Sequence, residues 1–123
     1  MEKKYYINDI AKKFNISEHT LRYYDKKMLL KNFKRDDNGY RYLNEDDLRT
    51  IEVIICLKKT NMSLEDIKHY LKLVEQGRDT LKERQQMIEK QLQEAHSIRK
   101  DIDDQIVYLE YKLKFYDDLI KEN

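Results

Sequence analysis

The last third of the chain carries an apolar repeat with a seven-residue period. Over residues 81–120, ten of the twelve core positions of this repeat are apolar or aromatic, and the other two are Gln85 and Arg99. The ten are Leu81, Ile88, Leu92, Ala95, Ile102, Ile106, Leu109, Leu113, Tyr116 and Ile120. A heptad repeat sustained over this length predicts a coiled coil.

A helix over residues 80–120 would be about 60 Å long, because each helical residue adds ~1.5 Å. A chain of 123 residues leaves only a modest globular domain, which cannot cover such a seam. We therefore expect the helix to pair with a second copy, with Gln85 and Arg99 helping to fix the register. The repeat does not distinguish parallel from antiparallel pairing, and a helix folded back on its own chain is the alternative.

Composition excludes several classes of protein. Charged residues make up 40% of the chain, proline is absent and glycine occurs twice, which favours a mostly helical fold. No apolar run reaches membrane-spanning length and no signal peptide is evident, so we expect a cytoplasmic protein. One cysteine and three scattered histidines predict no disulfide framework, no metal site and no cofactor. Without a phosphate-binding loop, a nucleophile elbow or an acid–histidine cluster, we expect no catalytic residues and no enzyme.

Charge is divided unevenly along the chain. Residues 1–43 hold 11 Lys/Arg and 6 Asp/Glu, a net charge of +5, whereas residues 44–123 hold 14 and 18, a net charge of −4. A basic first third is typical of a segment that faces a polyanion, although ordinary scatter of charge is the alternative.

Two short helices joined by a tight turn are predicted near the N-terminus. Asn8 is expected to cap the first, which pairs Ile10 with Phe14, and Ser17 to cap the second. This arrangement is a helix-turn-helix.

The second of these helices has two unlike faces. Leu21, Tyr24 and Met28 are spaced as one apolar stripe. The opposite face carries long polar side chains, as a helix in a DNA groove requires. They are His19, Arg22, Tyr23 and Lys26.

The next segment predicts a β-hairpin. Asn38-Gly39 stands between the short segments 33–35 and 40–42, and both of its residues tolerate positive φ. The arms of this wing carry Lys34, Arg35 and Arg41.

Two further helices complete the N-terminal part. Asn44 is expected to cap a helix over about residues 45–60, and Ser63 one that ends near Glu75. Leu48, Ile51 and Ile55 are the predicted inner stripe of the first. Gly77 suits a helix end, and Thr80 begins a second capping box. We thus predict a DNA-binding domain over residues 1–75, a linker over 76–79 and a dimerisation helix over 80–120.

The chain resembles the MerR family of transcription regulators. The resemblance rests on Thr-Leu-Arg-Tyr-Tyr-Asp at residues 20–25, Asn-Gly-Tyr-Arg-Tyr at 38–42 and Met-Ser-Leu at 62–64. It implies a mainly α fold, with a winged helix-turn-helix followed by an antiparallel coiled-coil dimerisation helix. Residues 28–31, Met-Leu-Leu-Lys, depart from the family's Gly-Leu-Ile-Pro-like link.

The resemblance also implies a mechanism. A homodimer of this family binds promoter DNA with an overlong spacer and, when activated, bends and undertwists it so that RNA polymerase engages both promoter boxes. Polar side chains of the second helix and the wing are the candidate DNA contacts, through phosphates or base edges. They are Ser17, His19, Thr20, Arg22, Tyr23, Lys26, Arg35, Tyr40 and Arg41.

A closer resemblance is to the NmlR/AdhR-like branch of aldehyde- and electrophile-responsive regulators. It rests on segments 54–58, 60–63, 77–80 and 114–116. In this branch a cysteine at the position of Cys56 is the proposed sensor, whereas the residues alone favour a small buried hydrophobe. Three functions stay open: a thiol-switched stress regulator, a regulator with a noncovalent effector, and a coiled-coil adaptor that does not bind DNA.

Overall fold

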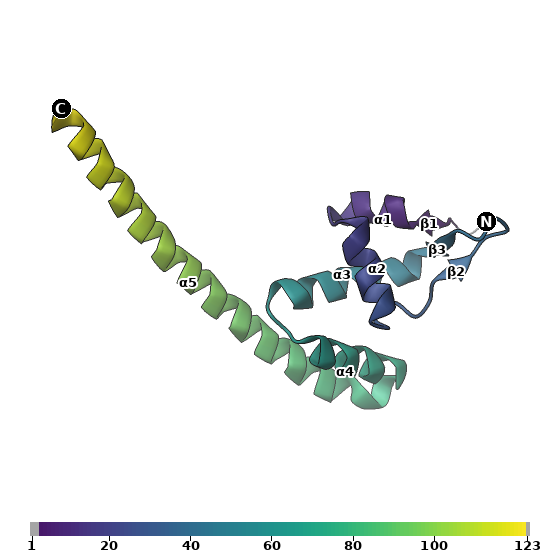
Figure 1. The fold of residues 1–123 in the computed structure, drawn as a ribbon. Helices are drawn as coiled ribbons and strands as arrows, with labels where there is room; N and C mark the ends of the chain where they lie inside the picture. The colour runs from purple at the N-terminus through teal and green to yellow at the C-terminus, as the bar shows by residue number, and fades with distance from the viewer. Residues whose placement is uncertain (1–2, 123) are drawn as a thin grey trace. The chain divides into compact units, whose positions relative to one another are not determined.

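The computed structural model describes residues 3–122 and divides into two compact units, one ending at Leu81 and the other beginning at Lys82. The elements are β1 (Tyr5–Tyr6), α1 (Ile7–Phe14), α2 (Glu18–Lys26), β2 (Lys34–Arg35), β3 (Arg41–Leu43), α3 (Glu45–Lys59), α4 (Leu64–Glu75), a 3₁₀ turn (Arg78–Thr80) and α5 (Leu81–Glu122) (Figure 1). The predicted fold class, a mainly helical winged helix-turn-helix with a long C-terminal helix, is confirmed.

The α1–turn–α2 motif is closed by short-range hydrogen bonds. Asn15 ends α1 in the left-handed conformation at φ 54°, and the Ile16 amide donates to the Ala11 carbonyl at 3.0 Å. Ser17 caps α2 as predicted, because its hydroxyl oxygen accepts from the Thr20 amide at 3.0 Å. Ile10 and Leu21 are fully buried, so the two helices share one core.

The predicted cap at Asn8 is wrong. Helix α1 begins at Ile7, and Tyr6 is the cap residue in extended conformation. The Asp9 carboxylate accepts from the Tyr6 amide at 3.0 Å, which satisfies a donor that the helix leaves unpaired. The helix starts earlier because β1 already delivers Tyr6 in the conformation that a cap requires.

The predicted stripe on α2 is correct at Leu21 and Tyr24, which are buried, and wrong at Met28, which is 62% exposed. The helix ends at Lys26, and Met28 has φ 66°. The Leu29 amide donates to the Tyr24 carbonyl at 2.9 Å and the Met28 amide to the Asp25 carbonyl at 3.0 Å. These two bonds form a Schellman motif, which turns the chain and carries Leu29 into the core instead.

The wing is part of a three-stranded antiparallel sheet in the order β1-β3-β2. Tyr42 of β3 pairs with Tyr6 on one side and Lys34 on the other. Strand β1 was not predicted from the sequence, because two residues are too few to show a period. The predicted hairpin forms. Both Asn38 and Gly39 tolerate positive φ, but of these two described residues only Gly39 has it, at 85°.

Helices α3 and α4 complete the core of the first unit. Asn44 and Ser63 cap them as predicted, accepting from the amides of Asp47 at 3.0 Å and Asp66 at 3.1 Å. The buried stripe of α3 contains Leu48 and Ile51 as predicted, but Ile54 in place of Ile55. Apolar residues run unbroken over 53–57, so the sequence does not define the phase of the stripe there. The buried residues of α3 are Leu48, Ile51, Ile54 and Leu57.

The end of α4 is fixed by Gly77 and Thr80. Gly77 has φ 85° and ψ −153°, a conformation essentially restricted to glycine. The Thr80 hydroxyl is buried and lies 2.6 Å from the Leu73 carbonyl oxygen, so it satisfies an acceptor in the last turn of α4.

Helix α5 is continuous over 42 residues, and none of them is buried. The predicted seam residues Leu109, Leu113 and Ile120 are 63%, 64% and 70% exposed. Intrahelical ion pairs lie outside this seam, at Lys100–Asp104 and Lys114–Asp118. The helix therefore carries an apolar stripe with no cover along residues 102–120.

Candidate nucleic-acid interface

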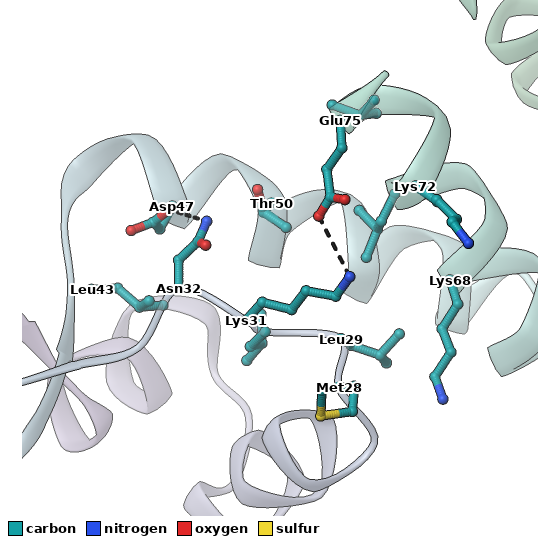
Figure 2. A pocket seen from close by; sticks show the side chains of 13 residues that line it. Met28, Leu29, Lys31, Asn32, Leu43, Asp47, Thr50, Lys68, Lys72 and Glu75 are labelled. Carbon is teal, nitrogen blue, oxygen red and sulfur yellow. Dashed lines mark hydrogen bonds and ion pairs between the residues drawn. The ribbon is translucent and has the colours of Figure 1, made fainter. Parts of the chain in front are cut away.

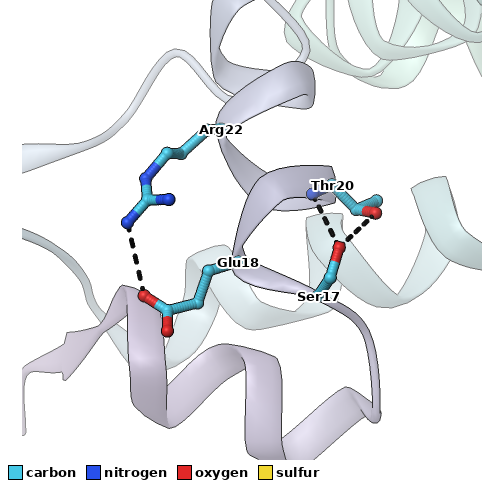
Figure 3. Close-up of polar contacts among 4 residues, drawn as sticks. All are labelled: Ser17, Glu18, Thr20 and Arg22. Carbon is cyan, nitrogen blue, oxygen red and sulfur yellow. Dashed lines mark hydrogen bonds and ion pairs between the residues drawn. The ribbon is translucent and has the colours of Figure 1, made fainter.

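The exposed face of α2 is polar, and hydrogen bonds fix the side chains at the N-terminal end of the helix. The Ser17 and Thr20 hydroxyl oxygens lie 2.8 Å apart, so the cap and the first turn support each other (Figure 3). Arg22 pairs with Glu18 at 3.5 Å, and both side chains are about half exposed. A pair this accessible contributes little to stability and leaves the Arg22 guanidinium able to exchange one anion for another.

The remaining predicted residues of α2 are also accessible. His19 and Lys26 are exposed, and Tyr23 is 40% exposed. The Tyr23 ring lies 6.3 Å from that of Tyr24, which is buried as a core residue. Tyr24, at 7% exposure, belongs to the core, whereas Tyr23 lies at the surface. Burial raises the pKa of the Tyr24 hydroxyl.

A single carboxylate organises the tip of the wing. Oδ1 of Asp36 accepts from the amides of Asn38 and Tyr40, both at 2.9 Å, and Oδ2 accepts from the Tyr6 hydroxyl at 2.9 Å. The bond from the Tyr40 amide is the main reason that the pKa of Asp36 is lowered. The bond to Asp36 in turn raises the pKa of Tyr6. Asp36 thereby joins the loop to β1, a contact that was not predicted from the sequence.

The wing is tied to α2 by one ion pair. Arg41 of β3 binds the carboxylate of Asp25, and their side chains are 28% and 26% exposed. The Arg41 guanidinium also lies 5.9 Å from the ring centre of Phe33. Asp25 therefore orients an arginine, and it restrains a residue that was predicted to contact DNA.

The two other wing residues are accessible. Tyr40 is 66% exposed, and Arg35 is exposed with Nη1 2.7 Å from the Gly39 carbonyl oxygen. The α2–wing surface is defined here by the nine predicted contacts: Ser17, His19, Thr20, Arg22, Tyr23, Lys26, Arg35, Tyr40 and Arg41. It comes from α2, its cap and the hairpin, all in the first unit.

Cys56 lies on α3 and is exposed, so the expectation of a small buried hydrophobe is wrong for this chain. Its backbone carbonyl accepts from the Thr60 hydroxyl at 2.9 Å. Among residues 3–122, no group of three or more His, Cys, Asp or Glu side chains is placed to hold a metal ion. Helices long and apolar enough to cross a membrane are likewise missing from this part of the chain.

A winged helix-turn-helix with an exposed polar recognition helix is the architecture of a DNA-binding regulator. Residues 5–73 match the family model described as MerR HTH family regulatory protein. The chain is 41% identical to an uncharacterized HTH-type transcriptional regulator of Haemophilus influenzae, over 86% of this chain and 78% of that protein. It is 35% identical to the regulator AdhR of Bacillus subtilis, over 67% of this chain and 59% of AdhR.

Solved structures agree with this assignment. The fold is similar to the crystal structure of HiNmlR, a MerR family regulator lacking the sensor domain, bound to promoter DNA. That comparison has a TM-score of 0.79 at 38% identity and covers 93% of this chain and 90% of HiNmlR. A MerR family regulator from Bacillus thuringiensis has a TM-score of 0.83 at 28% identity, covering 90% and 97%.

The chain therefore belongs to the MerR family of helix-turn-helix transcriptional regulators. This membership places it among regulators and not among enzymes, as the sequence predicted.

Proposed function

We propose that this protein is a homodimer that binds promoter DNA through two α2–wing surfaces and distorts an overlong spacer for RNA polymerase. The observation that carries the proposal is the pairing of an exposed polar face on α2 with a wing fixed to that helix by Asp25 and Arg41. Such a wing is positioned before DNA arrives, which reduces the entropy lost on binding. In the DNA-bound HiNmlR structure, a similar fold is bound to promoter DNA.

The proposed dimer rests on α5. Its seam residues are exposed over residues 102–120, and apolar surface is favourably removed from water by a partner helix. We assign residues 1–75 to DNA binding, 76–79 to a linker and 80–120 to an antiparallel coiled coil, the orientation that family membership suggests. The two DNA-binding domains of such a dimer can bind the two half-sites of a palindromic DNA site.

Bending and undertwisting the spacer is the proposed regulatory step. Strong bends of a short DNA site cost of order 1–6 kcal/mol, so an effector needs only to bias the dimer between two arrangements by a similar amount. We propose that modification of Cys56 by an electrophile or oxidant is one such bias. The exposed position of Cys56 supports this, because a sensor thiol must meet its reagent.

Two alternatives differ in what they require. A regulator with a noncovalent effector keeps the α2–wing surface and leaves Cys56 inert. A coiled-coil adaptor keeps α5 and abandons DNA, and membership in a family of HTH regulators favours the DNA-binding functions over it.

DNA binding is tested by a mobility shift with the protein's own upstream region at several salt concentrations. Arg22→Ala should weaken binding and reduce the salt slope by roughly 1, the loss of one phosphate contact. Lys59→Ala removes an exposed cation from α3 outside the α2–wing surface and is the matched control. Equal effects of both variants would mean that α2 does not face the DNA.

The dimer is tested by analytical ultracentrifugation. Leu109→Lys places a charge in the seam and should give monomers, whereas Glu94→Lys, on the opposite side of α5, should leave the dimer intact. A wild-type monomer at working concentration, with duplex DNA present, would refute the dimeric mechanism.

Thiol sensing is tested with Cys56→Ser. We expect this variant to bind the promoter as wild type does but to lose the change in transcription caused by an aldehyde. An unchanged aldehyde response would remove Cys56 from the mechanism and favour a noncovalent effector.

A further inference from the structure

A cavity of about 420 Å³ lies in the first unit, between the segment after α2 and the C-terminal half of α4 (Figure 2). Cavities of roughly 300–1,000 Å³ are typical of small-molecule sites. Leu29, Leu43 and Leu71 contribute to its lining, together with Met28 and Val74. Its position is separate from the residues assigned to DNA and from Cys56.

Part of the apolar lining of the cavity is exposed to solvent. Met28 is 62% exposed and Val74 is 42% exposed, although both border the cavity. Met28 is also held at φ 66°, a conformation that side-chain-bearing residues rarely adopt. A methionine is flexible and polarisable, and is suited to covering an apolar ligand of variable shape.

The rim of the cavity is positively charged. Lys31 Nζ lies 3.6 Å from Glu75 Oε1, and the side-chain amide of Asn32 donates from Nδ2 to Oδ1 of Asp47 at 3.0 Å, so both bordering carboxylates already have partners (Figure 2). Lys68 and Lys72 of α4 complete the rim. Within residues 3–122 neither of these two lysines forms an ion pair.

We propose that this cavity binds small amphipathic carboxylates, with the apolar part against Met28 and Val74 and the carboxylate between Lys68 and Lys72. Two uncompensated cations beside an apolar wall fit a ligand with one anionic end and one apolar end. Such a ligand would link α4 to the segment that follows α2. Its role as an effector rests on the proposed function, whereas its binding does not.

The probe is octanoate, titrated into the full chain and followed by the methyl signals of Met28 and Val74 in carbon–proton NMR spectra. We expect saturable shifts confined to the cavity. Octan-1-ol and octylammonium have the same tail and should bind at least threefold more weakly. Equal binding of all three probes, shifts centred on α5, or no saturation would overturn the proposal.

Charge variants locate the anion. Lys68→Gln with Lys72→Gln should weaken octanoate binding at least threefold, and Lys59→Gln, an exposed lysine outside the cavity, should leave it unchanged. Because these side chains are exposed, the variants are expected to fold. If the double variant weakens DNA binding and leaves octanoate binding unaltered, the two lysines serve DNA phosphates and the proposal is wrong.

Two further measurements separate the remaining outcomes. Methyl shifts that change with protein concentration in the absence of probe would mean that a second copy of the chain fills the cavity, which refutes the proposal. Saturating octanoate should change DNA affinity in wild type but not in Val74→Trp, which fills the cavity. An unchanged DNA affinity would overturn the effector role, whereas octanoate binding without any DNA binding would refute the proposed function alone.

Discussion

The ion pair between Asp25 and Arg41 allows the wing to be tested directly. A charge-assisted hydrogen bond contributes about 1.5–3 kcal/mol when shielded from water, and an exposed ion pair roughly 0–1 kcal/mol. The two side chains are 26% and 28% exposed, which is between these limits. We therefore expect a coupling energy of about 1–2 kcal/mol from a double-mutant cycle with Asp25→Ala and Arg41→Ala, measured by urea unfolding at fixed protein concentration.

The effect on DNA separates positioning from charge. Asp25→Asn removes a negative charge beside a polyanion, so simple electrostatics predicts tighter binding. If Asp25 holds Arg41 in place, freeing that side chain instead costs about 0.5–1.5 kcal/mol of ordering on binding, a loss of roughly 2- to 12-fold in affinity. Glu18→Gln is the matched control, because it also removes an acidic side chain from α2, but Glu18 pairs with the exposed Arg22 and not with Arg41. Tighter binding by Asp25→Asn, or a coupling energy near zero, would refute the positioning role.

Three other substitutions test the backbone and the wing. Met28→Gly should raise the free energy of unfolding by about 0.5–1 kcal/mol in thermal melts, because relief of φ 66° outweighs the added freedom of glycine in the unfolded chain; a lower melting temperature would contradict this. Gly77→Ala should lower the free energy of unfolding by roughly 1–3 kcal/mol. The cost comes from the backbone conformation at φ 85° and ψ −153° alone, since a Cβ added there meets no atom within 4 Å. An unchanged melting temperature would show that the turn relaxes. Folding lowers the pKa of Asp36, so its carboxylate stabilises the wing at pH values above the pKa that it has in the unfolded chain. This stabilisation is lost as the pH falls through the pKa of the folded state. The stability difference between wild type and Asp36→Asn, followed by denaturation from pH 6 downward, should therefore shrink in acid, and a constant difference would exclude the carboxylate.

Local signals in the sequence were sufficient for most helix positions. Ser17, Asn44 and Ser63 each cap the helix that they were expected to cap, because capping depends on a hydroxyl or amide oxygen and the next three residues only. The heptad repeat likewise predicted one long C-terminal helix, since its period spans the whole of α5.

The wrong predictions fall where strand pairing, core packing or the end of a helix decides the position of a residue. Asn8 does not cap α1 because Tyr6 is already extended by pairing with β3, which comes 36 residues later along the chain. Met28 leaves the predicted stripe because Leu29 takes the buried position after the helix turns back. On α3, Ile54 is buried rather than Ile55. All residues from 53 to 57 are apolar, so the packing of the helix determines which of them face the core.

The positions of the helices, the hairpin turn and the polar side chains of α2 follow from the sequence, because helical period, capping and turn chemistry act over a few residues. Three contacts depend on how the chain packs: Asp25 restrains Arg41, Asp36 joins the wing to β1, and two lysines of α4 border an apolar cavity. These arrangements join residues up to 47 positions apart, from Met28 to Glu75, and no local pattern encodes such contacts because the side chains meet only after the core has packed.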